Sequence, residues 1–285
     1  MNINPADKFI FDREKYALVW QKNNRVFRDS SRVDLPQAIF ISAFDRLTST
    51  NTKLWSILDS GGTCPVGAIA GHQTAGKGQW GHSWVSHVGG LYLSVGLDVD
   101  LDLAYYPHLV MATAWGIASV LRHYQLPVTI KWLNDLILDC HKLGGIKIET
   151  RNQNHKLTQA VVGVGINWHN SVPAPGINLK SYYQNKQGDR ISSLEELTAI
   201  TTYGILWGYK YYLAVGIEQL LAKYLEICSS IGQQIDFNGC SGEVIGVTQK
   251  GKLKLKLRSP GASSVIELVP GQVSLGYEID RGYGS

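Results

Sequence analysis

Residues 71–94, GHQTAGKGQWGHSWVSHVGGLYLS, place six glycines and two tryptophans between two apolar runs. Glycine has no Cβ, so its backbone N–H groups can approach a ligand closely, and successive free amides form a concavity that binds anions. Lys77 adds a positive charge between two of these glycines, and a neighbouring tryptophan can stack on a flat ring. Taken alone, the segment predicts either an anion-binding loop or an Ω-loop or hairpin with glycine turns.

The first seven residues of this segment also match the phosphate-binding P-loop pattern GxxxxGK. The next position of that pattern is a Ser or Thr whose hydroxyl holds magnesium, but here it is Gly78. The residues that follow, QWGHSW, do not resemble the start of a helix. Both differences affect the mechanism of the motif, so a P-loop is not expected.

Short apolar or alternating runs predict strands on both sides of the glycine-rich loop. They cover residues 38–44, 66–70, 91–97, 128–132, 136–139, 146–151 and 157–166. Helical spacing predicts helices over residues 50–58 and 106–124, and a further helical region opens at Ser193, which fits a capping box with Glu196. The weakly patterned N-terminus shows no pair of amphipathic helices, and a short strand is expected there at residues 17–20.

The pattern changes near residue 231, after which short strands alternate with Gly and Pro turns and predict a small all-β barrel. In KGKLKLKLR, residues 250–258, lysines alternate with leucines, which indicates a half-buried strand with a charged outer face rather than a binding patch. We therefore expect an N-terminal extension (1–37), a central catalytic domain (38–231) and a C-terminal barrel (232–285).

The chain has 285 residues, of which 44% are hydrophobic and 18% charged, and its net charge is +4. This mildly basic balance contains no dense Lys/Arg run, so no nucleic-acid partner is expected. The N-terminus is unlike a signal peptide and no long apolar run occurs, so we expect a cytoplasmic protein without a membrane span. The four cysteines form no CxxC pair, which argues against a zinc site and favours free thiols.

Three separated segments carry a resemblance to one enzyme family. GHQTAGKGQWGHSW resembles the loop GRGRxGxxW of biotin–protein ligases, KWLNDLILDCHKLGGIKIE resembles their KWPNDhhhxxxKhxGIhhE (h is apolar), and VVGVGIN resembles their hhGhGIN. An STN triplet at residues 49–51 precedes these motifs, and PGQVSLGY resembles the C-terminal barrel of the family. The motifs come in the family's order and cover the chain from about residue 38 to its end.

The resemblance implies an α+β fold, in which a mixed sheet flanked by helices, similar to that of class II synthetases, is followed by an SH3-like β-barrel. It also implies a two-step reaction with biotin and ATP as substrates. The biotin carboxylate attacks the α-phosphate of ATP and gives biotinoyl-5′-adenylate and pyrophosphate. A lysine of a biotin carboxyl carrier protein, such as that of an acetyl-CoA carboxylase, then attacks the mixed anhydride and gives an amide and AMP. The sequence leaves both a monomer and a homodimer open.

Two anions meet in the first step, so the site must offset their repulsion. The resemblance implies that Lys142 is the main electrostatic catalyst, that Lys77 is a second catalytic cation, and that Lys131 adds a third charge. The residues expected to contact biotin, ATP or the adenylate are Ser49, Thr50, Asn51, Gln73, Gly76, Lys77, Gly78, Gln79, Trp84, Ser94, Lys131, Asn134, Lys142, Gly144, Gly145 and Asn167.

Several of these residues have a second interpretation. The STN triplet and Gln73 match family positions around the ureido ring of biotin, although Ser49 is also placed to cap the following helix. Ser94 either lines the pocket or forms a hydrogen bond within the sheet. Trp84 packs either on adenine or in the core, and Asn167 is expected on the adenine side.

Asp135 has three interpretations: a magnesium ligand, a residue that positions Lys142, or an Asx-turn residue. Mg²⁺ is expected as the counter-ion of ATP, bound mainly through phosphate oxygens.

The loop departs from the family pattern. Lys77 replaces the first arginine and lacks its planar, bidentate fork, while the second arginine is the neutral Gln79. Trp80 stands where a further basic residue is frequent. The sequence therefore predicts a weaker phosphate clamp in the loop and a greater reliance on Lys142.

Two alternatives remain. A lipoate–protein ligase or octanoyl transferase is thought to share the fold but lacks the KWxND–GGI pairing and the terminal barrel. A non-catalytic paralogue that binds biotin or a carrier protein would explain the lost arginines. Because the N-terminal region does not resemble a DNA-binding domain, we expect a ligase without a repressor role.

Overall fold

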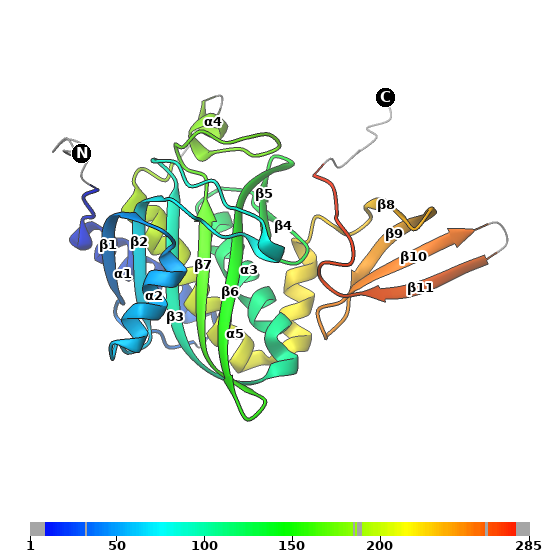
Figure 1. Cartoon of the computed structure of the whole chain (residues 1–285), viewed down its shortest axis with the longest axis horizontal. Coiled ribbons are helices and arrows are strands. Elements are labelled where there is room, and N and C mark those ends of the chain that lie inside the picture. Colours follow the sequence, from blue (N-terminus) through cyan, green and yellow to red (C-terminus); the bar gives the residue numbers. More distant parts are fainter. Residues whose placement is uncertain (1–8, 32, 185, 187–189, 260–261, 278–285) are drawn as a thin grey trace.

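A seven-stranded mixed sheet forms the centre of the molecule, and a second, four-stranded sheet follows it in the chain (Figure 1). The computed structural model describes residues 9–31, 33–184, 186, 190–259 and 262–277. The predicted α+β fold, a mixed sheet flanked by helices, is confirmed.

The strands of the main sheet lie in the order β1-β2-β3-β7-β6-β5-β4. Only β1 and β2 run parallel, whereas every other neighbouring pair is antiparallel. Each strand overlaps a run predicted from the sequence. Their bounds are β1 (Phe40–Leu47), β2 (Val66–Gln73), β3 (Leu91–Asp102), β4 (Thr129–Lys131), β5 (Asp135–Leu138), β6 (His141–Gln153) and β7 (Lys156–Ile166).

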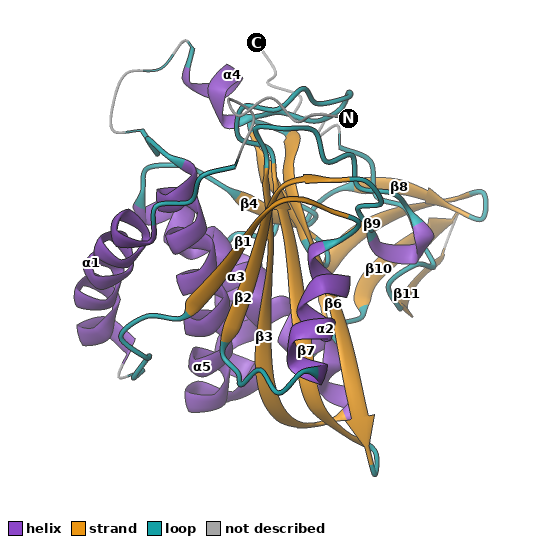
Figure 2. Ribbon diagram, turned by 60° about the vertical axis from the view of Figure 1, so that its left-hand side comes forward, coloured by secondary structure: helices purple, strands orange, loops and turns teal. Residues whose placement is uncertain are grey.

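Helices cover both faces of this sheet (Figure 2). On one face, α2 (Thr50–Asp59) packs against β2, β3 and β7. On the other, α3 (Tyr106–His123) and α5 (Leu194–Glu226) form a layer that α1 (Arg13–Ser31) extends by packing on α5. The remaining short elements are η2 (Gln79–Gly81), η3 (Leu103–Tyr105) and α4 (Leu179–Tyr183).

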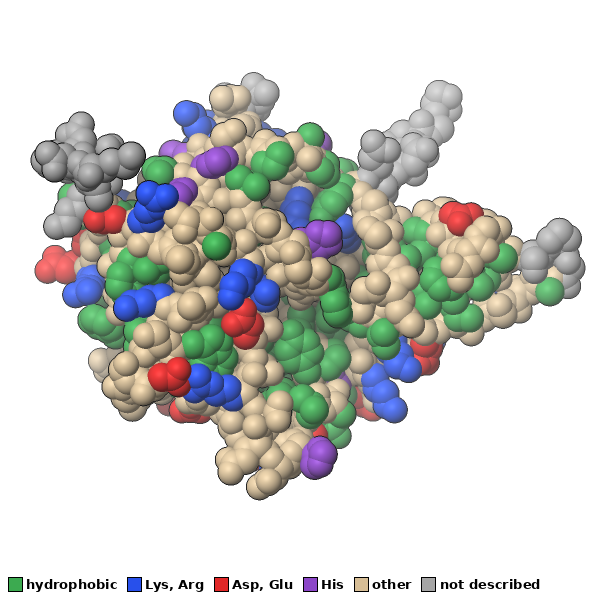
Figure 3. Space-filling view, in the orientation of Figure 1, with side chains coloured by type: hydrophobic (Ala, Val, Ile, Leu, Met, Phe, Trp, Pro, Cys, Tyr) green, Lys and Arg blue, Asp and Glu red, His purple; other side chains and the backbone are tan. Residues whose placement is uncertain are grey.

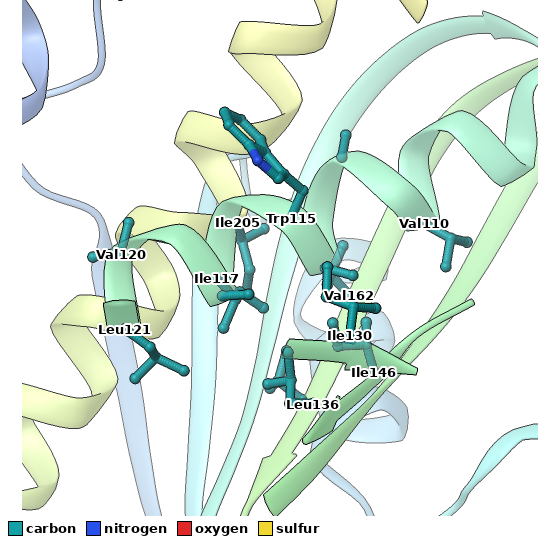
Figure 4. Packing of buried hydrophobic residues seen from close by; sticks show 14 of the residues in the cluster. Val110, Trp115, Ile117, Val120, Leu121, Ile130, Leu136, Ile146, Val162 and Ile205 are labelled. Carbon is teal, nitrogen blue, oxygen red and sulfur yellow. The ribbon is translucent and has the colours of Figure 1, made fainter. Parts of the chain in front are cut away.

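The main core lies between α3 and the sheet (Figure 4). Val110, Ile117 and Leu121 on α3 are fully buried, as are the strand residues Ile130 and Leu136. Burial of apolar side chains is the main source of stability in such a layered fold. This packing fixes β4 and β5 at the sheet edge where charged side chains gather.

The short strand expected at residues 17–20 is wrong, because these residues lie inside α1 (Arg13–Ser31). Asp12 accepts hydrogen bonds from the backbone N–H groups of residues 14 and 15, which begins the helix. Trp20 is fully buried and its ring lies 5.3 Å from that of Tyr203 on α5. The local pattern is weak, and packing on α5 stabilises the helix.

The C-terminal module forms an open four-stranded sheet in the described residues. The prediction of a closed barrel is therefore wrong. Its strands lie in the order β11-β10-β9-β8, and the outer strands do not pair with each other. The chain leaves β11 toward the main domain instead of adding a strand that would close the sheet (Figure 1). The strands are β8 (Gln234–Phe237), β9 (Cys240–Val247), β10 (Leu253–Ser259) and β11 (Ala262–Leu268).

The alternation predicted for residues 250–258 is confirmed, because Leu253 and Leu255 on β10 are fully buried between lysines that are not. Within the described part of the chain, no helix combines the length and the apolar character needed to cross a membrane.

The close crossing of α3 and α5 gives a first prediction. A Cβ on Gly208 would collide with the backbone carbonyl of Ala112 and would approach the Cα of Gly116 at 3.0 Å. Since a backbone cannot yield as a side chain does, we expect Gly208→Ala to lower the free energy of unfolding by about 2 kcal/mol or more in urea titrations. Gly246→Ala is the control, because its Cβ would meet only the Lys254 side chain, at 3.8 Å. Equal stability of the two variants would contradict the close packing.

Candidate active site

A cavity of about 530 Å³ opens between the main sheet and the residues that follow β11. Its walls are the glycine-rich loop after β2, the start of α2, the hairpins of β4, β5 and β6, and the end of β7. Figure 3 shows the molecule hollowed on this face, between the main body and the C-terminal sheet. The volume lies in the range of about 300–1,000 Å³ typical of small-molecule sites.

A polar network occupies the wall formed by the start of α2. The Ser94 hydroxyl lies 2.7 Å from Thr50 Oγ1 and 2.6 Å from Asn51 Oδ1. The backbone N–H of Thr50 donates to Gln73 Oε1 at 2.8 Å, and Gln73 Nε2 donates to Ser86 Oγ at 2.9 Å. Ser49 stands at the N-cap of α2, as predicted, but its side chain makes no capping hydrogen bond. This wall presents fixed donors and acceptors to the cavity.

Glycines on two neighbouring strands make room for the side chains of the site. A Cβ on Gly163 of β7 would collide with the side-chain amide of Asn51, and one on Gly165 would collide with the indole of Trp84. On β6, a Cβ on Gly145 would lie 3.5 Å from the same indole. The two glycines of the GVGIN motif therefore allow the Asn51 amide and the Trp84 ring to pack directly on the sheet.

Two lysines and one aspartate form a charge cluster at the opposite wall. Lys142 Nζ lies 2.8 Å from Asp135 Oδ1, and Lys131 Nζ lies 3.6 Å from Asp135 Oδ2. Burial lowers the pKa of Lys131, the charge of Asp135 raises it, and the neighbouring Lys142 lowers it further. Lys142 Nζ also lies 5.5 Å from the ring centre of Trp84. The cluster carries a net positive charge and faces the cavity.

The glycine-rich loop folds over the cavity as a tight turn. Its backbone closes through Gly78 N–H to the carbonyl of His82 at 2.6 Å and through Trp84 N–H to the carbonyl of Gly76 at 2.9 Å. Lys77 is exposed, and its Nζ donates to Thr52 Oγ1 at 3.4 Å. The loop thus brings one cation to the rim.

The structure brings most of the predicted site residues together. Those that line the cavity are Ser49, Thr50, Asn51, Gln73, Lys77, Gly78, Gln79, Trp84, Lys131, Asn134, Asp135, Lys142 and Gly145.

Gly76, Ser94, Gly144 and Asn167 do not line the cavity and lie behind its wall. Ser94 forms hydrogen bonds with Thr50 and Asn51, which line the cavity in its place. Asn167 Nδ2 donates to the backbone carbonyl of Lys142 at 3.4 Å, so it supports the turn that carries this lysine.

One wall of the cavity was missed by the sequence analysis. Residues 270–277, here named the C-terminal strap, cross the cavity mouth after β11. Lys131 Nζ donates to the carbonyl of Leu275 at 2.9 Å, and the Tyr277 hydroxyl donates to Asp135 Oδ2 at 2.8 Å. The PGQVSLGY motif marks this segment in the sequence, but the motif alone does not indicate contact with a turn far away in the chain.

Most residues that line the cavity lie in a segment that matches a known protein family. Residues 43–167 match the model of the Biotin/lipoate A/B protein ligase family. This part of the chain is similar to that family. The match spans β1 to β7 and therefore contains the polar network, the glycine-rich loop and the charge cluster.

Curated proteins similar to this chain include two bacterial proteins. The chain is 23% identical over 221 residues to the bifunctional ligase/repressor BirA of Bacillus subtilis, which covers 74% of this chain and 68% of the relative. It is 38% identical over 112 residues to BirA of Escherichia coli, which covers 39% of this chain and 34% of the relative. The chain thus spans about a third of the length of the Escherichia coli protein.

A solved structure shares the fold. The biotin protein ligase from Aquifex aeolicus, in complex with biotin and ATP, superposes with a TM-score of 0.61 at 20% identity. The superposition covers 80% of this chain and 98% of that chain.

The buried hydroxyl of Ser94 gives a second prediction. Ser94 is fully buried and bridges Thr50 and Asn51, so Ser94→Ala leaves buried polar atoms without this partner. We expect a loss of about 1–2 kcal/mol in the free energy of unfolding, measured by urea denaturation. In the control Ser60→Ala, the lost hydroxyl is exposed, and the change should stay within about 0.5 kcal/mol. A loss no larger for Ser94→Ala than for the control would argue against the network.

Proposed function

We propose that the chain is an ATP-dependent biotin–protein ligase that activates biotin as biotinoyl-5′-adenylate and transfers it to a lysine of a biotin carboxyl carrier protein. The proposal is supported by the family of residues 43–167 and by the fold shared with a ligase whose structure contains biotin and ATP. The observation that carries it is a single cavity with a buried polar wall on one side and a cationic cluster on the other.

Each wall suits one part of the reaction. The ureido ring of biotin needs fixed donors and acceptors, which Thr50, Asn51 and Gln73 offer. Its carboxylate and the phosphates of ATP need positive charge, which Lys142 and Lys131 supply. Biotin bound between the two walls would direct its carboxylate toward the lysines.

The first step joins a carboxylate oxygen to the α-phosphorus and releases pyrophosphate. Lys142 stabilises the negative charge that gathers on the phosphoryl oxygens, and Asp135 holds its ammonium in place. Trp84 adds an aromatic wall beside that ammonium and offers a surface for a flat ring. In the second step, the neutral amine of the acceptor lysine attacks the acyl carbon and AMP leaves.

The described residues do not favour a magnesium ion held by protein ligands. They contain no group of three or more His, Cys, Asp or Glu side chains placed to bind a metal. Asp135, the predicted ligand, is paired with Lys142 and accepts a hydrogen bond from Tyr277. We therefore assign Asp135 to positioning Lys142, and Mg²⁺ would enter with the phosphates of ATP.

We also propose a cytoplasmic location and no role in DNA binding. The location is supported by four cysteines without a disulfide, as expected in a reducing compartment. Monomer and homodimer both remain compatible with the proposed activity.

A substrate comparison tests the function. Pyrophosphate release should require ATP together with biotin, and a carrier domain should then gain the mass of one biotinoyl group, measured by mass spectrometry. Activity with lipoate or octanoate but not biotin would favour the alternative acyltransferase. Biotin binding in calorimetry without pyrophosphate release would instead favour the non-catalytic paralogue.

The main cation gives a third prediction. We expect Lys142→Ala to lower the rate of biotin-dependent pyrophosphate release by about 100-fold or more, because one preorganised charge at the reacting phosphate is lost. The matched control is Lys156→Ala, whose ammonium forms a comparable but exposed pair with Asp100 at 2.9 Å. Near-normal turnover of Lys142→Ala, or an equal loss in the control, would refute the assignment.

A further inference from the structure

The C-terminal strap (residues 270–277) connects three parts of the molecule across the cavity mouth. Its beginning contacts the glycine-rich loop, because a Cβ on Gly271 would lie 3.3 Å from the Trp80 indole. Its middle binds the main sheet through the carbonyl of Leu275, which accepts from Lys131 Nζ. Gln233, at the start of the C-terminal module, donates to the carbonyl of Gly276 at 3.2 Å. The position of the strap thus depends on all three parts.

Tyr277 is the strap residue that contacts the charge cluster. Its hydroxyl donates to Asp135 Oδ2 at 2.8 Å, while Oδ1 of the same carboxylate faces Lys142 at 2.8 Å. Its ring centre lies 3.4 Å from Lys131 Nζ and 5.9 Å from Lys142 Nζ. Burial and the charge of Asp135 raise the pKa of Tyr277, so its hydroxyl keeps the proton that it donates. A single side chain therefore contacts the carboxylate and one face of the cationic pair.

We propose that Tyr277 is a positioning residue for biotin activation, whose hydroxyl fixes Asp135 Oδ2 so that Oδ1 alone holds the ammonium of Lys142. The inference rests on the proposed ligase function and deepens it, since it assigns to a C-terminal residue the control of the main catalytic cation. Because the strap links the C-terminal module to Asp135, the module would also influence the rate of biotin activation.

The direction of the effect follows from the geometry of the carboxylate. With the phenol in place, Oδ2 accepts its hydrogen bond and Lys142 is paired with Oδ1 alone. The remaining N–H groups of Lys142 are then free to bind a substrate anion. Without the phenol, Oδ2 loses this hydrogen bond, and the carboxylate can turn so that both of its oxygens approach Lys142. Lys142 would then be held more tightly by the protein and would stabilise the transferring phosphoryl group less. Biotin binding at the polar wall would not change.

The test measures steady-state pyrophosphate release with biotin and ATP for the full chain and for Tyr277→Phe, which keeps the ring and removes only the hydroxyl. We expect kcat to fall about ten-fold, the size of effect expected from the loss of one hydrogen bond to a charged group. KM for biotin should stay within about two-fold, because the phenol lies at the opposite wall. The control is Tyr105→Phe, whose partly exposed ring stacks on His108, outside the residues that line the cavity.

A double-mutant cycle separates positioning from simple adhesion of the strap. If Tyr277 acts through Asp135, then adding Tyr277→Phe to Asp135→Asn should lower kcat by less than about two-fold, because the carboxylate that the phenol positions is already absent. If the phenol only holds the strap down, its removal should cost the same factor in both backgrounds, which would overturn the proposal.

Failure of this inference differs from failure of the proposed function. An active wild-type chain with an unchanged Tyr277→Phe variant would overturn the positioning role alone and leave the ligase assignment intact. A wild-type chain that releases no pyrophosphate with biotin would overturn both. A raised KM for biotin at normal kcat would contradict the positioning role, since it would place Tyr277 in substrate binding.

Discussion

Two ammonium groups share one carboxylate at the edge of the main sheet. Lys142 and Lys131 lie 2.8 Å and 3.6 Å from the two oxygens of Asp135, and both lysine side chains are largely removed from water. Without the carboxylate, each ammonium would lose hydration beside a like charge, which is strongly unfavourable in a low-dielectric site. With it, the cluster keeps a net charge of about one unit that an anion can approach. The chemistry proposed for the cavity depends on this partial neutralisation.

The register of the sheet sets this cluster. Lys131 and Asp135 are paired across β4 and β5, and Asp135 is paired with Gly145 on β6. An irregularity between Leu136 and Ile137 shifts the register before Lys142. Because a slip by one residue would turn each side chain to the opposite face, the cluster requires this pairing. The apolar contacts of β4 and β5 with α3 maintain it, so core packing and site geometry are linked.

Much of the main sheet could be predicted from sequence, because its strands are local apolar runs and its turns carry recognisable motifs. Gly163 and Gly165 of β7 make room for Asn51 and Trp84 of the protein itself, and no local pattern indicates these two partners. The helix α1 (Arg13–Ser31) escaped prediction because packing on α5 stabilises it more than its local pattern does. The contact of Tyr277 with Asp135 escaped because 142 residues separate them, and no local pattern encodes such a distance.

Most of the positive charge around the cavity lies on the sheet and not on the glycine-rich loop. The loop contributes Lys77, which is exposed, and Gln79, whose amide donates to the carbonyl of Ile146 at 3.4 Å. The paired cations instead sit on β4 and β6, where the sheet restrains their backbone. Charges on a rigid element need little reorganisation when an anion binds, so they stabilise a transition state more effectively than charges on a mobile loop. The tryptophans of the loop contribute aromatic surface to the cavity instead, and the ring of Trp84 packs on Gly165 of β7.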